Sequence, residues 1–288
     1  FNPGVVVKDS MVHMLYRATN NDIADKKNYI SSIGYAKLDM EGNLLHDSNK
    51  KVIYPTTPEE SMGCEDPRIV EFEEEYIIFY TAYNGPLARV GVAKTLDFES
   101  YEKIGYINHF AWDKDAFILP ERVNGKIVYI HRIEPSIQMD YFETLEELVS
   151  DASWRGYENR VMDQVVMGSE YEWESKKIGG SAPPVKTEKG WLFIYHGVDQ
   201  NMVYRSSVAL LDLHNPSKVL ARIPYPLLEP EEDYELYGDV PNVVFPEGAY
   251  IHEGYLYTYY GAADKYIALA RIQVDALLKE LEKYKLEG

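Results

Sequence analysis

The segment Gly63–Arg68 reads Gly-Cys-Glu-Asp-Pro-Arg and places two adjacent acids beside a proline and an arginine, directly before an apolar strand. A partly buried carboxyl group beside an arginine is suited to general acid catalysis, because burial raises its pKa while the guanidinium lowers it. The same residues also fit a charged turn in which Arg68 pairs with an acid. The pattern alone leaves both interpretations open.

Two further segments, Trp191–Val198 and Tyr257–Asp264, end predicted strands with polar side chains among small and aromatic residues. A single segment of this kind is typical of a core histidine or a capped turn. Several around one axis would form a polar, aromatic pocket, which suits carbohydrates because sugar faces stack on rings while hydroxyls need directed partners. The 25 tyrosines fit this interpretation, although strand propensity explains most of them.

Sequence signals for other chemistry are weak or absent. The chain contains no glycine-rich phosphate loop and no HExxH, CxxC or GxSxG motif. Asp113–Asp115 and Asp39–Gly42 resemble calcium ligands only in part, since neither continues into a full loop, and we expect no metal. The single cysteine, Cys64, has no nominated base, so we expect it to be a small buried residue.

Composition and charge exclude several classes of partner. The 288 residues carry 29 Lys and Arg against 47 Asp and Glu, a net charge of −18, so binding to nucleic acid through the overall field is not expected. No uncharged apolar run reaches the roughly 18 residues of a membrane span. With 45% hydrophobic residues the chain can build a large core. One cysteine and no signal segment favour the cytoplasm, and whether residues precede Phe1 stays open.

The elements that must position these side chains are predicted to be short strands, because runs of Val, Ile, Tyr and Phe alternate with turn residues. A hairpin with an acidic or glycine-containing turn recurs five times, and its closing residues follow at intervals of 64, 50, 65 and 64 residues. The five copies are Val5–Tyr16, Ile69–Tyr80, Phe117–Ile130, Pro184–Tyr195 and Val243–Tyr259. A third strand follows every copy except the third, at 32–36, 89–93, 207–211 and 267–270.

Five repeated antiparallel units predict an all-β fold, a five-bladed β-propeller, rather than a sandwich, because radial repetition leaves few exposed edges. We expect one catalytic domain over residues 1–288. Helical patterns cover 141–148 and 275–286, and the second carries an apolar stripe of Leu277, Leu278, Leu281 and Tyr284. The second pattern predicts a short C-terminal helix packed on the outside of a blade.

With these segments in view, the chain resembles glycoside hydrolase family 130, which contains mannoside phosphorylases and related β-mannosidases. Besides Gly63–Arg68, Trp191–Val198 and Tyr259–Asp264, short motifs follow the order of the family along nearly the whole chain. They are Phe1–Gly4, His13–Ala18, Lys114–Ala116, Leu119–Pro120, His131–Arg132, Lys177–Gly179, Gly190–Trp191 and Pro241–Pro246. Each motif is weak alone, but their order is specific. The family fold is a five-bladed propeller, in agreement with the repeat count.

The resemblance implies a role for nine residues. Asp66 would be the proton donor to the glycosidic oxygen, with the proton passing through a hydroxyl of the bound mannosyl unit. The residues that would hold the mannosyl ring are Asn2, Arg17, Glu65 and Asp264. The groups that would bind phosphate are Lys114, Arg132, Lys177 and His196.

The basic residues among these nine favour one chemistry. An inverting glycosidase needs a second carboxylate to activate water, whereas phosphate is already an anionic nucleophile and needs cations to hold it. Three cations and a histidine in an acidic protein therefore favour phosphorolysis. Together with the resemblance, this predicts a glycoside phosphorylase that performs inverting phosphorolysis of a β-mannoside to α-mannose 1-phosphate. Inorganic phosphate would be the co-substrate, and no cofactor is expected.

Alternatives to phosphorolysis stay open. Lys114-Asp115 stands where many phosphorylases of the family have Arg-Asn, so Asp113, Asp115 or Glu174 would serve as the base of a β-mannosidase on the same scaffold. A non-catalytic glycan-binding propeller predicts loss of the Asp66 carboxylate or of the basic set, and both are present. The acceptor sugar and linkage depend on rim loops, at 19–29, 83–87 and 225–237. A homo-oligomer is expected because the family often forms them.

Overall fold

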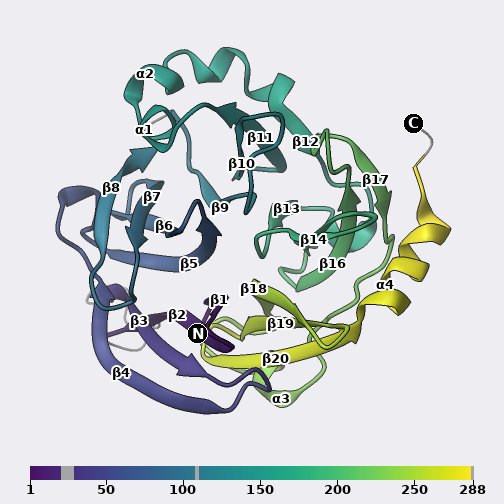
Figure 1. Cartoon of the computed structure of the whole chain (residues 1–288), viewed down its shortest axis with the longest axis horizontal. Coiled ribbons are helices and arrows are strands. Elements are labelled where there is room, and N and C mark those ends of the chain that lie inside the picture. Colours follow the sequence, from purple (N-terminus) through teal and green to yellow (C-terminus); the bar gives the residue numbers. More distant parts are fainter. Residues whose placement is uncertain (21–28, 108–109, 287–288) are drawn as a thin grey trace.

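The computed structural model describes residues 1–20, 29–107 and 110–286, and these form a mostly β structure. Its sheets are arranged around a common centre (Figure 1). The first sheet has the strand order β1-β2-β3-β5-β6-β7-β8, with β4 paired to β3. Its strands are β1 Pro3–Lys8, β2 Met11–Thr19, β3 Ser31–Leu38, β4 Leu44–Ile53, β5 Gly63–Phe72, β6 Glu75–Tyr83, β7 Ala88–Thr95 and β8 Glu102–Ile107.

One parallel pair, Ser31 with Gly63, joins β3 to β5, so this sheet consists of two antiparallel groups, β1–β4 and β5–β8. The remaining strands form three further antiparallel sheets, in the orders β12-β11-β10-β9, β13-β15-β16-β17 with β14 on β15, and β18-β19-β20. They are β9 Lys114–Ile118, β10 Ile127–Ile133, β11 Ser136–Phe142, β12 Val165–Met167, β13 Lys177–Gly180, β14 Val185–Thr187, β15 Gly190–Val198, β16 Tyr204–Leu211, β17 Val219–Arg222, β18 Val244–His252, β19 Tyr255–Ala262 and β20 Tyr266–Gln273.

The helices are short and lie between or outside the sheets. The α-helices are α1 Leu145–Leu148, α2 Asp151–Trp154, α3 Asp233–Leu236 and α4 Val274–Leu281. The 3₁₀ turns are Pro58–Glu60, Tyr157–Asn159, Val161–Gln164, Glu172–Glu174 and Glu282–Tyr284. None of the helices in the described ranges is long and apolar enough to cross a membrane.

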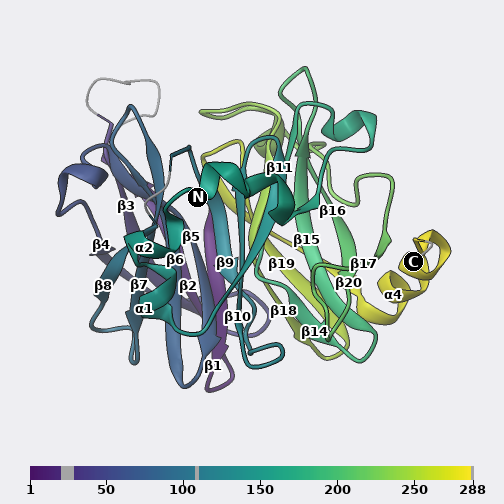
Figure 2. The ribbon, with the colours of Figure 1, turned by 90° about the horizontal axis from the view of Figure 1, so that it is seen from above.

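The C-terminal helix confirms its predicted apolar stripe. Leu277, Leu278 and Leu281 of α4 are buried and join a core cluster with Leu192 of β15 and Val208 of β16. Figure 2 shows α4 on the outer side of the sheet that contains β17. The predicted helix over 275–286 is therefore confirmed as α4 followed by a 3₁₀ turn.

All five predicted hairpins are present, but the third copy differs from the prediction in its next strand. The chain continues from β10 into β11 and α1 begins only at Leu145, so a helix from 141 is wrong. The strand β11 was not predicted because two of its polar residues are buried and form hydrogen bonds inside the protein. Gln138 bonds to both backbone groups of Ile133, and Asp140 accepts from Tyr157. A strand whose polar residues are satisfied in this way loses its apolar alternation.

The largest core cluster lies between neighbouring sheets and contains large side chains such as Phe79, Phe117, Tyr129 and Trp191. Cys64 is fully buried in a second cluster, as predicted for a small packed residue. Tight packing on both sides of β5 fixes the strand from which Glu65 and Asp66 project.

Candidate active site

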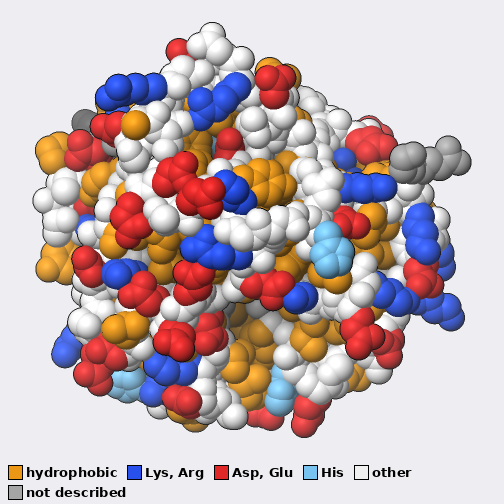
Figure 3. Space-filling view, turned by 45° about the horizontal axis from the view of Figure 1, so that its top comes forward, with side chains coloured by type: hydrophobic (Ala, Val, Ile, Leu, Met, Phe, Trp, Pro, Cys, Tyr) orange, Lys and Arg blue, Asp and Glu red, His pale blue; other side chains and the backbone are white. Residues whose placement is uncertain are grey.

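A cavity of about 260 Å³ gathers side chains from all the sheets of the described structure. Eight of the nine residues predicted for the site line it, and Glu65 lies just behind, in contact with Arg17. The lining residues are Asn2, Arg17, Asp66, Trp112, Lys114, Asp115, Arg132, Glu134, Lys177, His196, Tyr204, Val240, Val243, Phe245 and Asp264. On the surface, acidic and basic side chains are interspersed (Figure 3).

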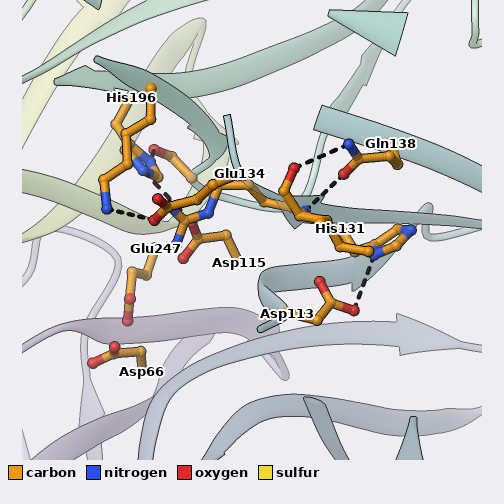
Figure 4. Close-up of polar contacts among 12 residues, drawn as sticks. Asp66, Asp113, Asp115, His131, Glu134, Gln138, His196 and Glu247 are labelled. Carbon is orange, nitrogen blue, oxygen red and sulfur yellow. Dashed lines mark hydrogen bonds and ion pairs between the residues drawn. The ribbon is translucent and has the colours of Figure 1, made fainter. Parts of the chain in front are cut away.

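Breaks in strand pairing aim acids from three strands toward the centre. The register of β5 against β6 shifts between Glu65 and Arg68, where Asp66 has a φ of 51°. The register of β9 against β10 also shifts beside Asp115, which has a φ of 55°, and that of β18 against β19 shifts at Glu247. Bulges re-aim side chains, and left-handed non-glycine residues cluster at functional sites. Figure 4 shows these three acids pointing toward one region.

The carboxylate of Asp66 is fixed by two donors that lie outside its own strand, one just before β1 and one in β2. Asn2 Nδ2 donates to Oδ1 of Asp66 at 2.9 Å, and Arg17 Nη1 donates to the same oxygen at 3.0 Å. A Cβ added at Gly261 would overlap Oδ1 of Asn2, so a glycine is needed there. Burial alone would raise the pKa of Asp66, but Arg17, Lys114 and Arg68 together hold it below its ordinary value.

Arg17 joins the acids predicted to hold a mannosyl ring. Its Nη2 donates to Oε1 of Glu65 at 2.7 Å, and Tyr29 donates to that oxygen at the same distance. Asp264 follows β19 and lines the same side of the cavity. Burial raises the pKa of Asp264 to about 6, and the nearby carboxylates of Asp66 and Glu65 add to the effect against the charge of Arg17.

Three of the four predicted phosphate-binding groups lie together. Arg132 Nε is 2.8 Å from Oδ2 of Asp115, and His196 Nε2 is 3.6 Å from the same oxygen. Glu134 Oε1 accepts from Arg132 Nη1 at 2.8 Å and from Lys177 Nζ at 2.7 Å. Burial lowers the pKa of His196 to about 3, so its imidazole is neutral at physiological pH and available for hydrogen bonding.

Lys114, the fourth predicted phosphate group, lines the cavity on the side of the acids. Its Nζ is 3.7 Å from Oε2 of Glu65 and 5.9 Å from the centre of the Tyr83 ring. Its positive charge helps to lower the pKa of Asp66.

The three acids named as bases for a hydrolase all have strong partners. Asp115 pairs with Arg132 and with Arg68 Nη2 at 3.1 Å, and these guanidiniums outweigh burial and hold its pKa far below its ordinary value. Asp113 is fully buried 2.9 Å from Nδ1 of His131. Glu174 binds Arg222 through both oxygens and is not among the residues that line the cavity. Within the described ranges, no cluster of three or more His, Cys, Asp or Glu side chains could hold a metal ion.

Arg68 does not pair with the side chains of its own turn. It donates to the backbone oxygen of Asp66 at 3.0 Å and to that of Ser181 at 3.1 Å, and its ion-pair partners are Asp115 and Glu247. Glu247 is fully buried. Burial raises its pKa well above the ordinary value, although the positive charge of Arg68 acts in the opposite direction. Arg68 thus fixes the turn at Asp66 through buried hydrogen bonds and ion pairs, and it does not form a surface ion pair.

Several residues at the cavity were not predicted from the sequence. Glu134 directly follows β10 and lies two residues after Arg132, and the only sequence signal for it was a charge at the end of a strand. Trp112 lines the cavity, is 47% exposed and donates to the backbone oxygen of Pro86 at 3.0 Å, which brings the predicted rim loop 83–87 to its edge. Rim loop 225–237 contributes no lining residue, and most of rim loop 19–29 lies outside the described residues.

Comparison with known proteins identifies the family. The family model described as beta-1,4-mannooligosaccharide phosphorylase, glycoside hydrolase family 130, matches residues 1–283. The chain belongs to glycoside hydrolase family 130. Among curated members, a β-1,2-mannobiose phosphorylase from Thermoanaerobacter sp. (strain X514) is 40% identical over 283 residues, which is 95% of this chain and 89% of the relative. A 1,2-β-oligomannan phosphorylase from the same strain is 35% identical and covers 95% and 90% of the two chains.

A solved structure of family 130 shares the fold. The β-1,2-mannobiose phosphorylase of Listeria innocua, in complex with β-1,2-mannobiose, superposes with a TM-score of 0.83 at 26% identity and covers 98% of this chain and 92% of that one. The predicted resemblance to family 130 is therefore confirmed over nearly the whole chain, and the relatives are mannoside phosphorylases.

Proposed function

We propose that the protein catalyses the inverting phosphorolysis of a β-mannoside to α-mannose 1-phosphate. The observation that carries the proposal is that Arg132, Lys177 and His196 line the same cavity as Asp66 and Asn2. Cations held together at one side suit an anionic nucleophile, and a carboxyl group at the other suits the leaving oxygen. The names of the two Thermoanaerobacter relatives favour a β-1,2 linkage.

The proposed reaction has one displacement step. A phosphate oxygen, held by Arg132 and Lys177, attacks the anomeric carbon while the glycosidic bond breaks on the opposite face. The proton for the leaving oxygen comes from Asp66 through a mannosyl hydroxyl. Because Arg17 and Lys114 keep the pKa of Asp66 low, the acid form must be favoured by the bound sugar, which removes water from the carboxylate and so raises its pKa.

We further propose that the strands form a five-bladed propeller within a single domain of residues 1–288. The blades would be β1–β4, β5–β8, β9–β12, β13–β17 and β18–β20. Support comes from the arrangement of these groups around one centre and from the packing of β1 against β18 (Figure 1). The cytoplasmic location and the homo-oligomer stay predictions.

The test is incubation of the protein with β-1,2-mannobiose, with and without inorganic phosphate. Formation of α-mannose 1-phosphate and mannose in equal amounts, only when phosphate is present, would support the proposal. Release of mannose at a rate that does not depend on phosphate would instead assign a β-mannosidase. Binding of mannobiose without turnover under either condition would assign the non-catalytic alternative.

A further inference from the structure

Glu134 lies among the cations that are proposed to bind phosphate. A single oxygen, Oε1, accepts from Nη1 of Arg132 and from Nζ of Lys177, at 2.8 and 2.7 Å. Figure 4 shows this carboxylate directed toward His196 and Asp115. One oxygen that bridges two cationic donors is also the arrangement that an oxygen of inorganic phosphate would adopt.

The three side chains differ in how firmly the protein holds them. The side chains of Arg132 and Lys177 are only 7% and 15% exposed, whereas that of Glu134 is 55% exposed. Arg132 is also paired to Asp115 behind it. The two cations are therefore fixed in the wall of the cavity, while the Glu134 carboxylate can turn out to solvent without losing buried packing.

An anion is needed where Glu134 stands. Two cations that are largely removed from water repel each other, and this cost shows in Lys177, whose pKa is lowered by burial and then by the charge of Arg132. Glu134 opposes that shift through its hydrogen bond and its charge. With no anion at this point, Lys177 would lose its proton more readily, and a bound phosphate would supply the missing negative charge.

We propose that Glu134 is an internal substitute for phosphate: it neutralises Arg132 and Lys177 when phosphate is not bound and is displaced by phosphate on binding. The inference rests on the proposed phosphorylase function. It makes Glu134 a specificity-determining residue, because an entering anion can replace the carboxylate while a neutral water molecule cannot. Phosphate affinity is then lower than the two cations alone would give, and water is kept from the position of the nucleophile.

The test compares Glu134→Gln with the wild type and with Glu121→Gln. Glu121 pairs with Lys186 on the surface at 2.5 Å, so this control removes the same charge from an exposed Glu–Lys pair that is not among the residues lining the cavity. Binding of inorganic phosphate is measured by calorimetry at fixed ionic strength, and the KM values for phosphate and mannobiose are measured separately.

We expect Glu134→Gln to bind phosphate about 2- to 30-fold more tightly, because two half-exposed ion pairs of roughly 0.2–1 kcal/mol each no longer compete. The KM for phosphate should fall by a similar factor, with the KM for mannobiose unchanged and Glu121→Gln like the wild type. Phosphate affinity that is unchanged or weaker in Glu134→Gln would overturn the inference.

These outcomes are separate from a failure of the proposed function. If the wild type forms no α-mannose 1-phosphate, the phosphorylase proposal fails, whatever the variant does. If the wild type forms it and Glu134→Gln does not bind phosphate more tightly, only the role of Glu134 fails.

Discussion

Arg68 and Asp115 form a buried ion pair at 3.1 Å that links the strand of the candidate proton donor to the strand that carries Lys114. The guanidinium also holds the backbone oxygen of Asp66 and faces Glu247. Because both side chains of the pair are at most 3% exposed, the link is shielded from water and from salt. The position of Asp66 therefore depends on a residue that does not line the cavity.

Replacement of Arg68 by Met should lower the free energy of unfolding by about 3–5 kcal/mol, because it removes one of the two guanidiniums paired with buried Asp115 and leaves buried Glu247 without its ion-pair partner. Urea denaturation measures this loss. Arg122→Met is the matched control, since Arg122 pairs with Glu73 at the surface and should cost at most about 1 kcal/mol. A loss of similar size in the two variants would mean that the Arg68 network does not stabilise the fold.

Replacement of Asp66 by Asn should keep the fold and reduce kcat on the order of 10²–10⁴-fold, because an amide of the same shape cannot supply the proton. Steady-state assays with mannobiose and saturating phosphate measure the loss, and circular dichroism checks the fold. A variant that retains most of the wild-type rate would remove Asp66 from the role of proton donor. Glu65, which contacts Arg17 beside it, would then be the next residue to replace.

Replacement of Arg132 or Lys177 by Ala should raise the KM for phosphate about 10- to 150-fold, and that for the mannoside far less. Each change removes a charge-assisted bond worth roughly 1.5–3 kcal/mol. The two substrates are varied independently at fixed ionic strength, with Lys186→Ala as a control for loss of one positive charge at the surface. Equal effects on the two KM values would contradict the assignment of these residues to phosphate.

Replacement of Asp264 by Asn should stabilise the protein at pH 8 and have little effect at pH 4. The pKa of Asp264 is about 6 in the folded protein, above its ordinary value of 3.8, so the folded state binds the proton more tightly and the wild type loses stability as pH rises between these values. The variant carries no such cost, and at about 1.4 kcal/mol for each pH unit between the two pKa values the gain at pH 8 should be on the order of 3 kcal/mol. Thermal unfolding from pH 4 to 8 measures it; a gain independent of pH would contradict the cause.

The hairpins were predictable because their turns carry local signals. Asn124-Gly125 and Glu253-Gly254 stand between apolar runs, and both turns contain residues of positive φ, as such turns require. The strand β11 was not predictable in the same way, since Gln138 and Asp140 find partners that lie elsewhere in the chain or the fold. Strand prediction relies on the alternation of apolar residues, and buried polar residues that form internal hydrogen bonds interrupt this alternation.

The residues of the candidate site could be nominated from motif order, but their relationships could not. The sequence placed Arg68 beside Asp66, yet the acids that pair with its side chain are Asp115 and Glu247, which are 47 and 179 positions away. Glu134 carried no sequence signal beyond its charge, because its proposed role depends on a hydrogen bond from Lys177, which lies in another sheet. Such pairs arise only when the sheets come together, so they depend on tertiary packing.

The residues that form the cavity around Asn2 are translated at very different times. Asn2 meets Asp66 early in the chain, but the space it occupies is bounded by Gly261, and the cavity also needs Asp264. A nascent chain emerging from the ribosome therefore carries its candidate proton donor long before the pocket around it can close. Activity can begin only after translation has passed Asp264, and any product of early termination before Asp264 lacks a complete site.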